Sequence, residues 1–295
     1  MRALRISLLV VMATVDARAQ TPPGGGAEAA YRTGIALKEQ GKTDEAIGQF
    51  EQAVVLNPKH HMAWNSLGIL YKKKGDHAKA VDAFEHAVDL MPKDAIARAN
   101  LGMAYYRAGR EDDAVKSLEA AAGLDPNAAD VQANLGTIHR KRGNLDKAIF
   151  HLEAANRLKP NDAQTLTNLG NAYSHAKRYD DALKVYRRAL ELEPGKAEMH
   201  FNLAATLRRK DMVDEAIEEY KAAVRLDPNL ADAWYDLGIM YRAVKDNPAA
   251  VDAFQRYLTL TRGKDAATDA KVEEEIRALG GPPAATNPKK KGKAK

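Results

Sequence analysis

The sequence contains no cysteine. Without thiols there is no disulfide framework, no thiolate zinc site, no cysteine nucleophile and no lipid-bearing N-terminal cysteine. Aromatic residues are also scarce, at 6% of the chain, although hydrophobic residues as a whole reach 45%. That balance argues against a β-sandwich, which is rich in aromatic and β-branched side chains, and favours helices built from alanine and leucine.

The chain opens with a short apolar run, Ile6–Val15. Ten residues are too few for a transmembrane helix, which needs about 20. Arg2 and Arg5 precede the run, and Ala17-Arg18-Ala19 follows it with small residues in an A-x-A pattern. This layout predicts a secretory signal peptide over residues 1–19, with an ordinary N-terminal helix as the alternative.

Cleavage directly after Ala19 would leave Gln20 as the new N-terminus. Proline and glycine dominate residues 20–26, which predicts a flexible linker because both residue types break helices. Since no cysteine is present to carry a lipid, we expect a soluble exported protein. The periplasm is the simplest destination, and secretion is the alternative.

The formal net charge of +5 comes from the two ends of the chain. Residues 1–19 carry three arginines against one aspartate, a net +2, and residues 289–295 carry five lysines, a net +5. Residues 20–288 are therefore left with a net −2, and nucleic acid is not expected as a partner. We expect residues 281–295 to be a disordered tail. Its lysines would offer contacts to an anionic envelope surface; they include Lys289, Lys290 and Lys291.

One 34-residue unit recurs along most of the chain. Trp64 and Trp234, the only tryptophans, are 170 residues apart, which is five times 34. A fixed period of this length without insertions is the signature of a solenoid. The same step separates the prolines Pro58, Pro92, Pro126, Pro160, Pro194 and Pro228, and the alanines Ala46, Ala80, Ala114, Ala148, Ala182, Ala216 and Ala250.

The unit resembles the tetratricopeptide repeat. The second repeat carries the family's residue in every signature slot: Trp64, Leu67, Gly68, Tyr71, Ala80, Phe84, Ala87 and Pro92. The resemblance implies an all-α fold, a right-handed α-solenoid (superhelix) of seven helix-turn-helix repeats. The expected repeats span residues 27–60, 61–94, 95–128, 129–162, 163–196, 197–230 and 231–262. Residues 265–279 are expected to form a helix that caps the stack.

No catalytic or metal-binding motif is evident among the repeats. The eight histidines form no pair at helical i, i+4 spacing. Carboxylates gather at the starts of second helices, as in Glu111-Asp112-Asp113 and Asp180-Asp181. There they are expected to complement the helix dipole and cap free N–H groups. We therefore expect no enzyme activity, no metal and no cofactor.

Asparagine recurs at one slot of the first helices. Four consecutive repeats place it there, as Asn100, Asn134, Asn168 and Asn202, and Asn171 lies three residues beyond one of them. A primary amide both donates and accepts hydrogen bonds, so such a row can match the backbone of an extended peptide. The row resembles the asparagine ladder in the repeat superhelix of O-linked N-acetylglucosamine transferases, which implies a peptide in the concave groove. The alternative is that asparagine is simply common at this slot.

Basic triplets end the first helices of alternate repeats. They complement the negative helix end, or they form a basic rim that attracts an acidic partner. The rim residues are Lys72, Lys73, Arg140, Lys141, Arg208 and Arg209.

The hypothesis that accounts for these features is a non-catalytic protein-binding scaffold in the cell envelope, acting as an assembly factor. It would hold an extended peptide or helix of a partner in its groove. The alternatives are an electrostatic adaptor on an anionic envelope surface and a substrate-recruiting subunit of a separate enzyme.

Overall fold

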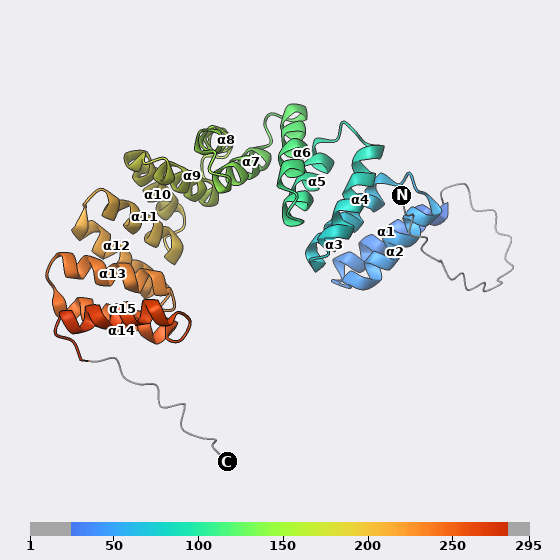
Figure 1. Ribbon diagram of the computed structural model, residues 1–295. Coiled ribbons are helices and arrows are strands. Elements are labelled where there is room, and N and C mark those ends of the chain that lie inside the picture. Colours follow the sequence, from blue (N-terminus) through green and yellow to red (C-terminus); the bar gives the residue numbers. More distant parts are fainter. Residues whose placement is uncertain (1–24, 283–295) are drawn as a thin grey trace, which may run out of the picture. The chain divides into compact units, whose positions relative to one another are not determined.

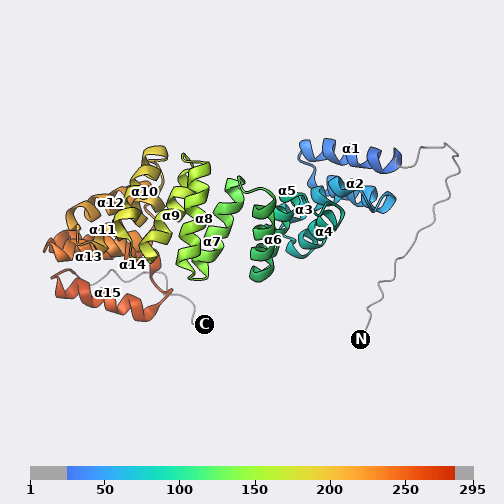
Figure 2. The same ribbon diagram turned by 90° about the horizontal axis from the view of Figure 1, so that it is seen from above.

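The computed structural model describes residues 25–282, and within that range all regular structure is helical. The expected signal peptide, its cleavage site and the terminal lysines lie outside the described residues. Figures 1 and 2 show the helices in chain order. Their bounds are α1 Gly25–Glu39, α2 Thr43–Leu56, α3 His61–Lys74, α4 His77–Leu90, α5 Ala95–Arg107, α6 Glu111–Leu124, α7 Ala129–Lys141, α8 Leu145–Leu158, α9 Ala163–His175, α10 Tyr179–Leu192, α11 Ala197–Arg209, α12 Val213–Leu226, α13 Ala231–Ala243, α14 Asn247–Thr261 and α15 Ala266–Ala278.

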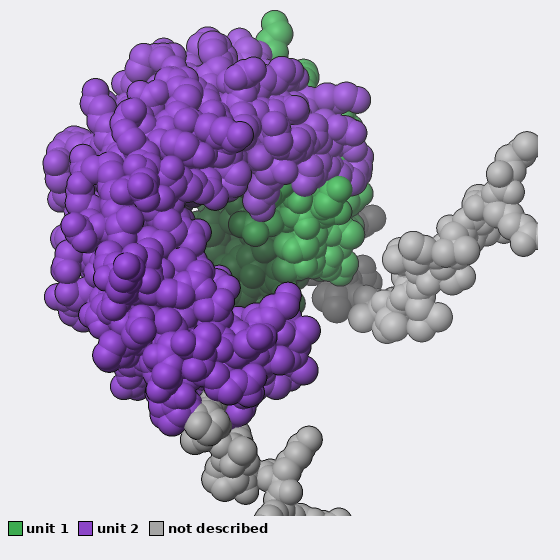
Figure 3. Space-filling model, turned by 60° about the vertical axis from the view of Figure 1, so that its left-hand side comes forward, with its two compact units in different colours: residues 1–109 green, residues 110–295 purple. Residues whose placement is uncertain are grey.

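The chain divides into two compact units, residues 1–109 and residues 110–295 (Figure 3). The division lies inside the third repeat, between α5 and α6. In unit 1, α1 pairs with α2 and α3 with α4, and α5 packs on α4. In unit 2, the pairs are α7 with α8, α9 with α10, α11 with α12 and α13 with α14, each packed on the next. Consecutive hairpins that contact only their neighbours are the organisation of a solenoid, so the predicted all-α repeat fold is confirmed.

The two helices of a hairpin approach closely because the first helix has glycine where the second has a large side chain. A Cβ atom on Gly68 would lie 2.6 Å from the Phe84 ring, and one on Gly170 would lie 2.6 Å from the Tyr186 ring. Both rings are at most 1% exposed. Glycine recurs at this slot every 34 residues from Gly34 to Gly170, and this recurrence reflects a steric requirement between paired helices.

A hydrogen bond joins neighbouring repeats at a regular place. The tyrosine near the end of a first helix donates to a glutamate on the second helix of the preceding repeat. The O–O distances are 2.5 Å from Tyr71 to Glu51 and 2.6 Å from Tyr173 to Glu153. Each bond closes the seam between two hairpins that otherwise pack through apolar side chains.

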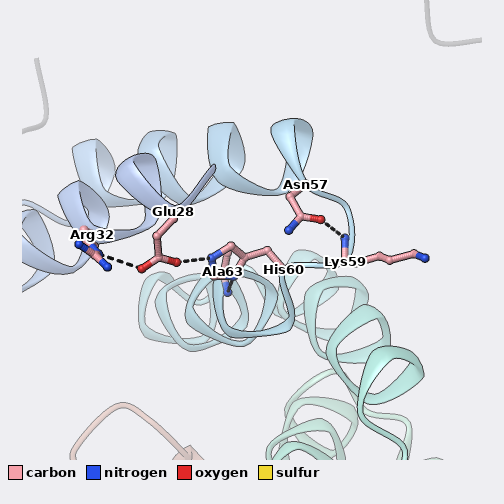
Figure 4. Close-up of polar contacts among 6 residues, drawn as sticks. All are labelled: Glu28, Arg32, Asn57, Lys59, His60 and Ala63. Carbon is pink, nitrogen blue, oxygen red and sulfur yellow. Dashed lines mark hydrogen bonds and ion pairs between the residues drawn. The ribbon is translucent and has the colours of Figure 1, made fainter. Parts of the chain in front are cut away.

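His60 joins the first two repeats at the turn between α2 and α3 (Figure 4). Its Nδ1 accepts a hydrogen bond from the backbone N–H of Ala63 at 3.3 Å, which caps α3. Its Nε2 lies 3.4 Å from the Glu28 carboxylate, which also accepts a 2.9 Å hydrogen bond from Arg32. The Arg32 guanidinium lowers the pKa of Glu28, and His60 adds to that effect.

The N-terminal end of the described chain differs from expectation, whereas the C-terminal helix packs where a capping helix was expected. The linker was expected to include Gly25 and Gly26, but α1 begins at Gly25, so these glycines form its first turn. At the other end, Val272 and Ile276 of α15 are at most 1% exposed and pack with Phe254 and Leu258. Burial of this stripe covers the apolar face of α14, as expected of a capping helix.

Candidate functional site

The first helices of unit 2 contact one another, α7 with α9, α9 with α11 and α11 with α13. Helices that approach each other more closely than their partners lie on the inner side of a curved stack. We call the surface formed by α7, α9, α11 and α13 the inner face of unit 2. The helices that form it carry three of the four asparagines of the row, Asn134, Asn168 and Asn202. Asn100 lies on α5 in unit 1, where its amide donates to Asn65 Oδ1 at 3.3 Å.

The three amides on the inner face are partly buried and only loosely held. Asn168 donates to Thr137 Oγ1 and accepts from Gln164 Nε2, both at 3.4 Å, which is long for a hydrogen bond. For Asn134 and Asn202, no side-chain hydrogen bond is found within the described residues. The structure therefore leaves most of the hydrogen-bonding capacity of these amides available.

Asn171 is held more firmly, by a residue that sequence reasoning missed. The Tyr186 hydroxyl donates to Asn171 Oδ1 at 2.6 Å. Tyr186 occupies the slot where three other repeats have phenylalanine, and its ring packs against Gly170 in the same way. The added hydroxyl passes beyond the glycine and reaches the inner face. The sequence feature that could have revealed it is a tyrosine in the phenylalanine slot, which recurs one repeat later as Tyr220.

The Tyr220 hydroxyl reaches Asp236 of the next repeat. Asp236 Oδ2 accepts from Tyr220 at 3.0 Å, and Oδ1 accepts from Arg208 at 2.9 Å. Burial raises the pKa of the Asp236 carboxyl, and the Arg208 charge partly offsets that effect. Burial likewise raises the pKa of Tyr220. After the last asparagine of the row, the charge of Arg208 is therefore balanced by Asp236.

The basic triplets are partly neutralised between repeats. Their third members pair with acidic residues at the start of the preceding repeat's second helix: Lys74 with Asp44, Arg142 with Glu111 and Asp112, and Lys210 with Asp180. Of the expected rim, Lys72, Lys73, Lys141 and Arg209 are exposed, whereas Arg140 and Arg208 are only partly exposed.

The carboxylates at helix starts lie in the first turns, where they favour the dipole. The partners found for their side chains are cations. Asp113 pairs with Arg110 at 2.8 Å and Asp181 with Arg178 at 2.7 Å. The expected capping of N–H groups by these carboxylates is not seen in α6 or α10, whose N-cap residues are arginines without a capping side chain.

Unit 1 has a pocket lined by residues of α1, α3 and α5 and by the end of α4. Its lining includes Tyr31, Met62, Asn65, Ser66 and Met91. Met62 is 45% exposed and Met91 41% exposed. His61 and Asp94 also line the pocket, so it offers polar as well as apolar contacts.

Across residues 25–282, no group of three histidine, aspartate or glutamate side chains is placed to hold a metal ion. In the same range, none of the helices combines the length and apolar character that crossing a membrane requires.

Comparison with known families identifies the class of protein. Residues 2–233 match the family model described as the cilia and flagella-associated protein 70 C-terminal domain, which is a tetratricopeptide repeat model. Residues 213–267 match a second model, described as tetratricopeptide repeat. The first match covers more than half of the sequence and agrees with the helical hairpins. The chain belongs to the tetratricopeptide repeat family. No curated protein shows a significant sequence match.

Solved structures with the same fold are distant in sequence. The C-terminal part of a TPR repeat-containing protein from Cytophaga hutchinsonii is 19% identical, with a TM-score of 0.67 over 83% of this chain and 99% of that chain. YrrB, described as a TPR protein with an unusual peptide-binding site, is 23% identical, with a TM-score of 0.57 over 66% of this chain and 100% of that chain. MamA is 27% identical, with a TM-score of 0.55 over 59% of this chain and 96% of that chain. These likenesses show the fold that the chain shares with tetratricopeptide repeat proteins.

Proposed function

We propose that this protein is a non-catalytic scaffold that holds an extended peptide segment of a partner protein on the inner face of unit 2. The observation that carries the proposal is the amide row Asn134, Asn168 and Asn202, on consecutive first helices at one helical position. A primary amide offers two donors and one acceptor group, as a peptide backbone offers N–H and C=O in alternation. The row would hold the peptide through its backbone, with little regard to its sequence.

The state of these amides supports this function. Residues that only stabilise the fold are expected to be saturated by protein partners, because unpaired buried polar groups are costly. Asn134 and Asn202 have no side-chain hydrogen bond within the described part of the chain, and those of Asn168 are long. YrrB shares the fold, and a peptide-binding site is described for it.

We further infer that the scaffold works in the cell envelope as an assembly factor for another envelope protein. The arginines, apolar run and A-x-A pattern of residues 1–19 support export. No catalytic step is assigned to the inner face of unit 2.

The experiment is a binding measurement with a random library of N-acetylated, C-amidated decapeptides. The best binders are resynthesised with a fluorophore and titrated by anisotropy. The double variant N134A/N168A should bind them about tenfold or more weakly, because each lost hydrogen bond contributes about 0.5–1.5 kcal/mol. Scrambled versions of the same peptides should lose much less affinity.

The matched control is N127A/N229A, which removes two exposed asparagines from turns between repeats. It should bind like the unmodified protein. Equal affinities for the amide-row variant and this control would contradict the proposal.

A further inference from the structure

Two arginines on the inner face of unit 2 lack a carboxylate partner. Arg140, at the end of α7, has its Nε buried without a hydrogen bond. Arg209, at the end of α11, makes one long contact, 3.5 Å from Nη1 to Ser174 Oγ. Within residues 25–282, neither forms an ion pair, whereas the neighbouring Arg208 and Arg142 both do. The two unpaired guanidinium groups come from the repeats on either side of α9.

The surface between these arginines is polar and neutral. Ser174 Oγ lies 3.2 Å from Thr206 Oγ1, which donates to the Asn202 carbonyl at 2.9 Å. Ser174 and Thr206 are 7% and 1% exposed, so this hydroxyl chain is fixed in place. It continues the Tyr186–Asn171 hydrogen bond along α9.

The helices that end in these two arginines, α7 and α11, both contact α9, and Arg209 reaches Ser174 of α9. Burial raises the pKa of the Tyr186 phenol, and the charges of Arg140 and then Arg209 oppose that effect. Both guanidinium groups therefore lie near α9 without a carboxylate as a direct partner in the described part of the chain.

We propose that Arg140 and Arg209 together receive the carboxylate of an aspartate or glutamate side chain in the peptide bound on the inner face of unit 2. The inference rests on the proposed function and names the chemistry of its ligand. A guanidinium offers a planar fork of donors that fits a carboxylate. A carboxylate at this place would accept hydrogen bonds from the accessible ends of both guanidinium groups and balance the local charge.

A single carboxylate fits better than a polyanion. The first helix that ends in Arg209 begins with an acidic residue, Glu198, whereas Asp130 at the start of α7 pairs with Lys159. A chain of phosphates laid along the inner face would approach Glu198 and be repelled. An acidic side chain on an otherwise neutral peptide would meet only the arginine end.

The test uses the full-length protein and a positional-scanning library of N-acetylated, C-amidated decapeptides. The unmodified protein should enrich aspartate or glutamate at one position. Replacing that residue by asparagine or glutamine in a selected peptide should weaken binding about 10- to 100-fold, as for a charged hydrogen bond. The variant R140A/R209A should lose this preference and still bind peptides through the amide row.

A charge reversal separates recognition from misfolding. Because Arg209 is exposed, R209E should fold, and it should select lysine or arginine at the same peptide position. The control R187A/R188A removes two arginines from the second helix α10, where they pair with Glu215 and Glu191. It should keep the acidic preference.

The outcomes distinguish the two proposals. Peptide binding without any acidic preference, or a preference that survives in R140A/R209A, overturns this inference and leaves the scaffold function standing. A protein that binds no member of the library overturns both. Acidic enrichment that R209E converts to basic enrichment supports both.

Discussion

At the scale of single residues, His139 is the clearest departure from the repeat. It stands in the slot where Tyr71, Tyr105 and Tyr173 donate to a glutamate of the preceding repeat. Glu119 occupies the matching glutamate position. Both ring nitrogens of His139 are buried without a hydrogen bond, and the side chain is 3% exposed. The seam between the third and fourth repeats therefore lacks a bond that other seams have.

The buried imidazole at this position should make the stability of the fold depend on pH. Burial lowers the pKa of His139 from its ordinary 6.5, and the charge of Lys147 adds to the effect. Burial also lowers the pKa of His151, whose ring stacks on His139 at 5.5 Å. Both imidazoles are thus held neutral in the fold but bind protons at ordinary pKa values when unfolded. Stability should therefore fall as pH drops below about 6.5 toward the lowered values.

The variant H139Y should remove much of this dependence. It replaces an unpaired buried imidazole by a phenol that can donate to Glu119, a gain of about 1–3 kcal/mol in the free energy of unfolding. Urea unfolding followed by circular dichroism at pH 8 and pH 5 is the measurement. H139F, which has the ring but no hydroxyl, separates the hydrogen bond from loss of the titrating group. An equal decline toward pH 5 in all three proteins would refute this account.

The role of a single residue could be predicted from the sequence where the same residue recurs in several repeats. The asparagine row could be predicted because its members recur every 34 residues. The roles of Arg140 and Arg209 could not be separated from a general basic rim, because only the fold shows that Arg208 is paired and they are not. Tyr186 was missed because a hydroxyl added to a core ring leaves the hydrophobic pattern unchanged.

At the scale of helices, the sequence predicted the hairpins well because each contact within a repeat is local. Helix starts were less predictable. Gly25 and Gly26 lie inside α1 although glycine disfavours helices by about 1 kcal/mol per residue. They lie in its first turn, and the backbone at Gly26 packs close to α2, where a Cβ atom would lie 3.4 Å from Leu56.

The helix pairs should be sensitive to a single methyl group. A Cβ atom on Gly136 would lie 2.5 Å from Leu152 Cγ and 3.0 Å from the Ala148 carbonyl oxygen. G136A should lower the free energy of unfolding by about 1–3 kcal/mol, because α7 and α8 must separate. Thermal or urea unfolding measures it.

The control is G48A in the middle of α2. No atom lies within 4 Å of a Cβ built on Gly48. Alanine there should raise stability by about 0.5–1 kcal/mol through helix propensity alone. If G136A were as stabilising as G48A, the close approach of α7 and α8 would not be a packing requirement.

At the scale of the whole molecule, the net positive charge and the proposed peptide-binding residues lie on different segments of the chain. Residues 20–288 carry a net −2, and residues 289–295 carry a net +5. The peptide-binding proposal uses only residues of unit 2, whereas attachment to an anionic surface would use the terminal lysines. One deletion can therefore distinguish the scaffold from the electrostatic adaptor.

Deleting residues 289–295 should move the protein from the envelope fraction to the soluble fraction while its affinity for library peptides stays unchanged. The attachment should also weaken as salt rises, since the screening length falls from about 10 Å at 0.1 M to about 3 Å at 1 M. Fractionation at both salt concentrations, with the N-terminus read by mass spectrometry and expected at Gln20, measures both points. Replacing the five lysines by glutamine is the control for chain length and should act like the deletion. If the truncated protein fractionates like the full chain at low salt, the tail does not tether it. The proposed contacts of the protein would then be the amide row and the arginine pair.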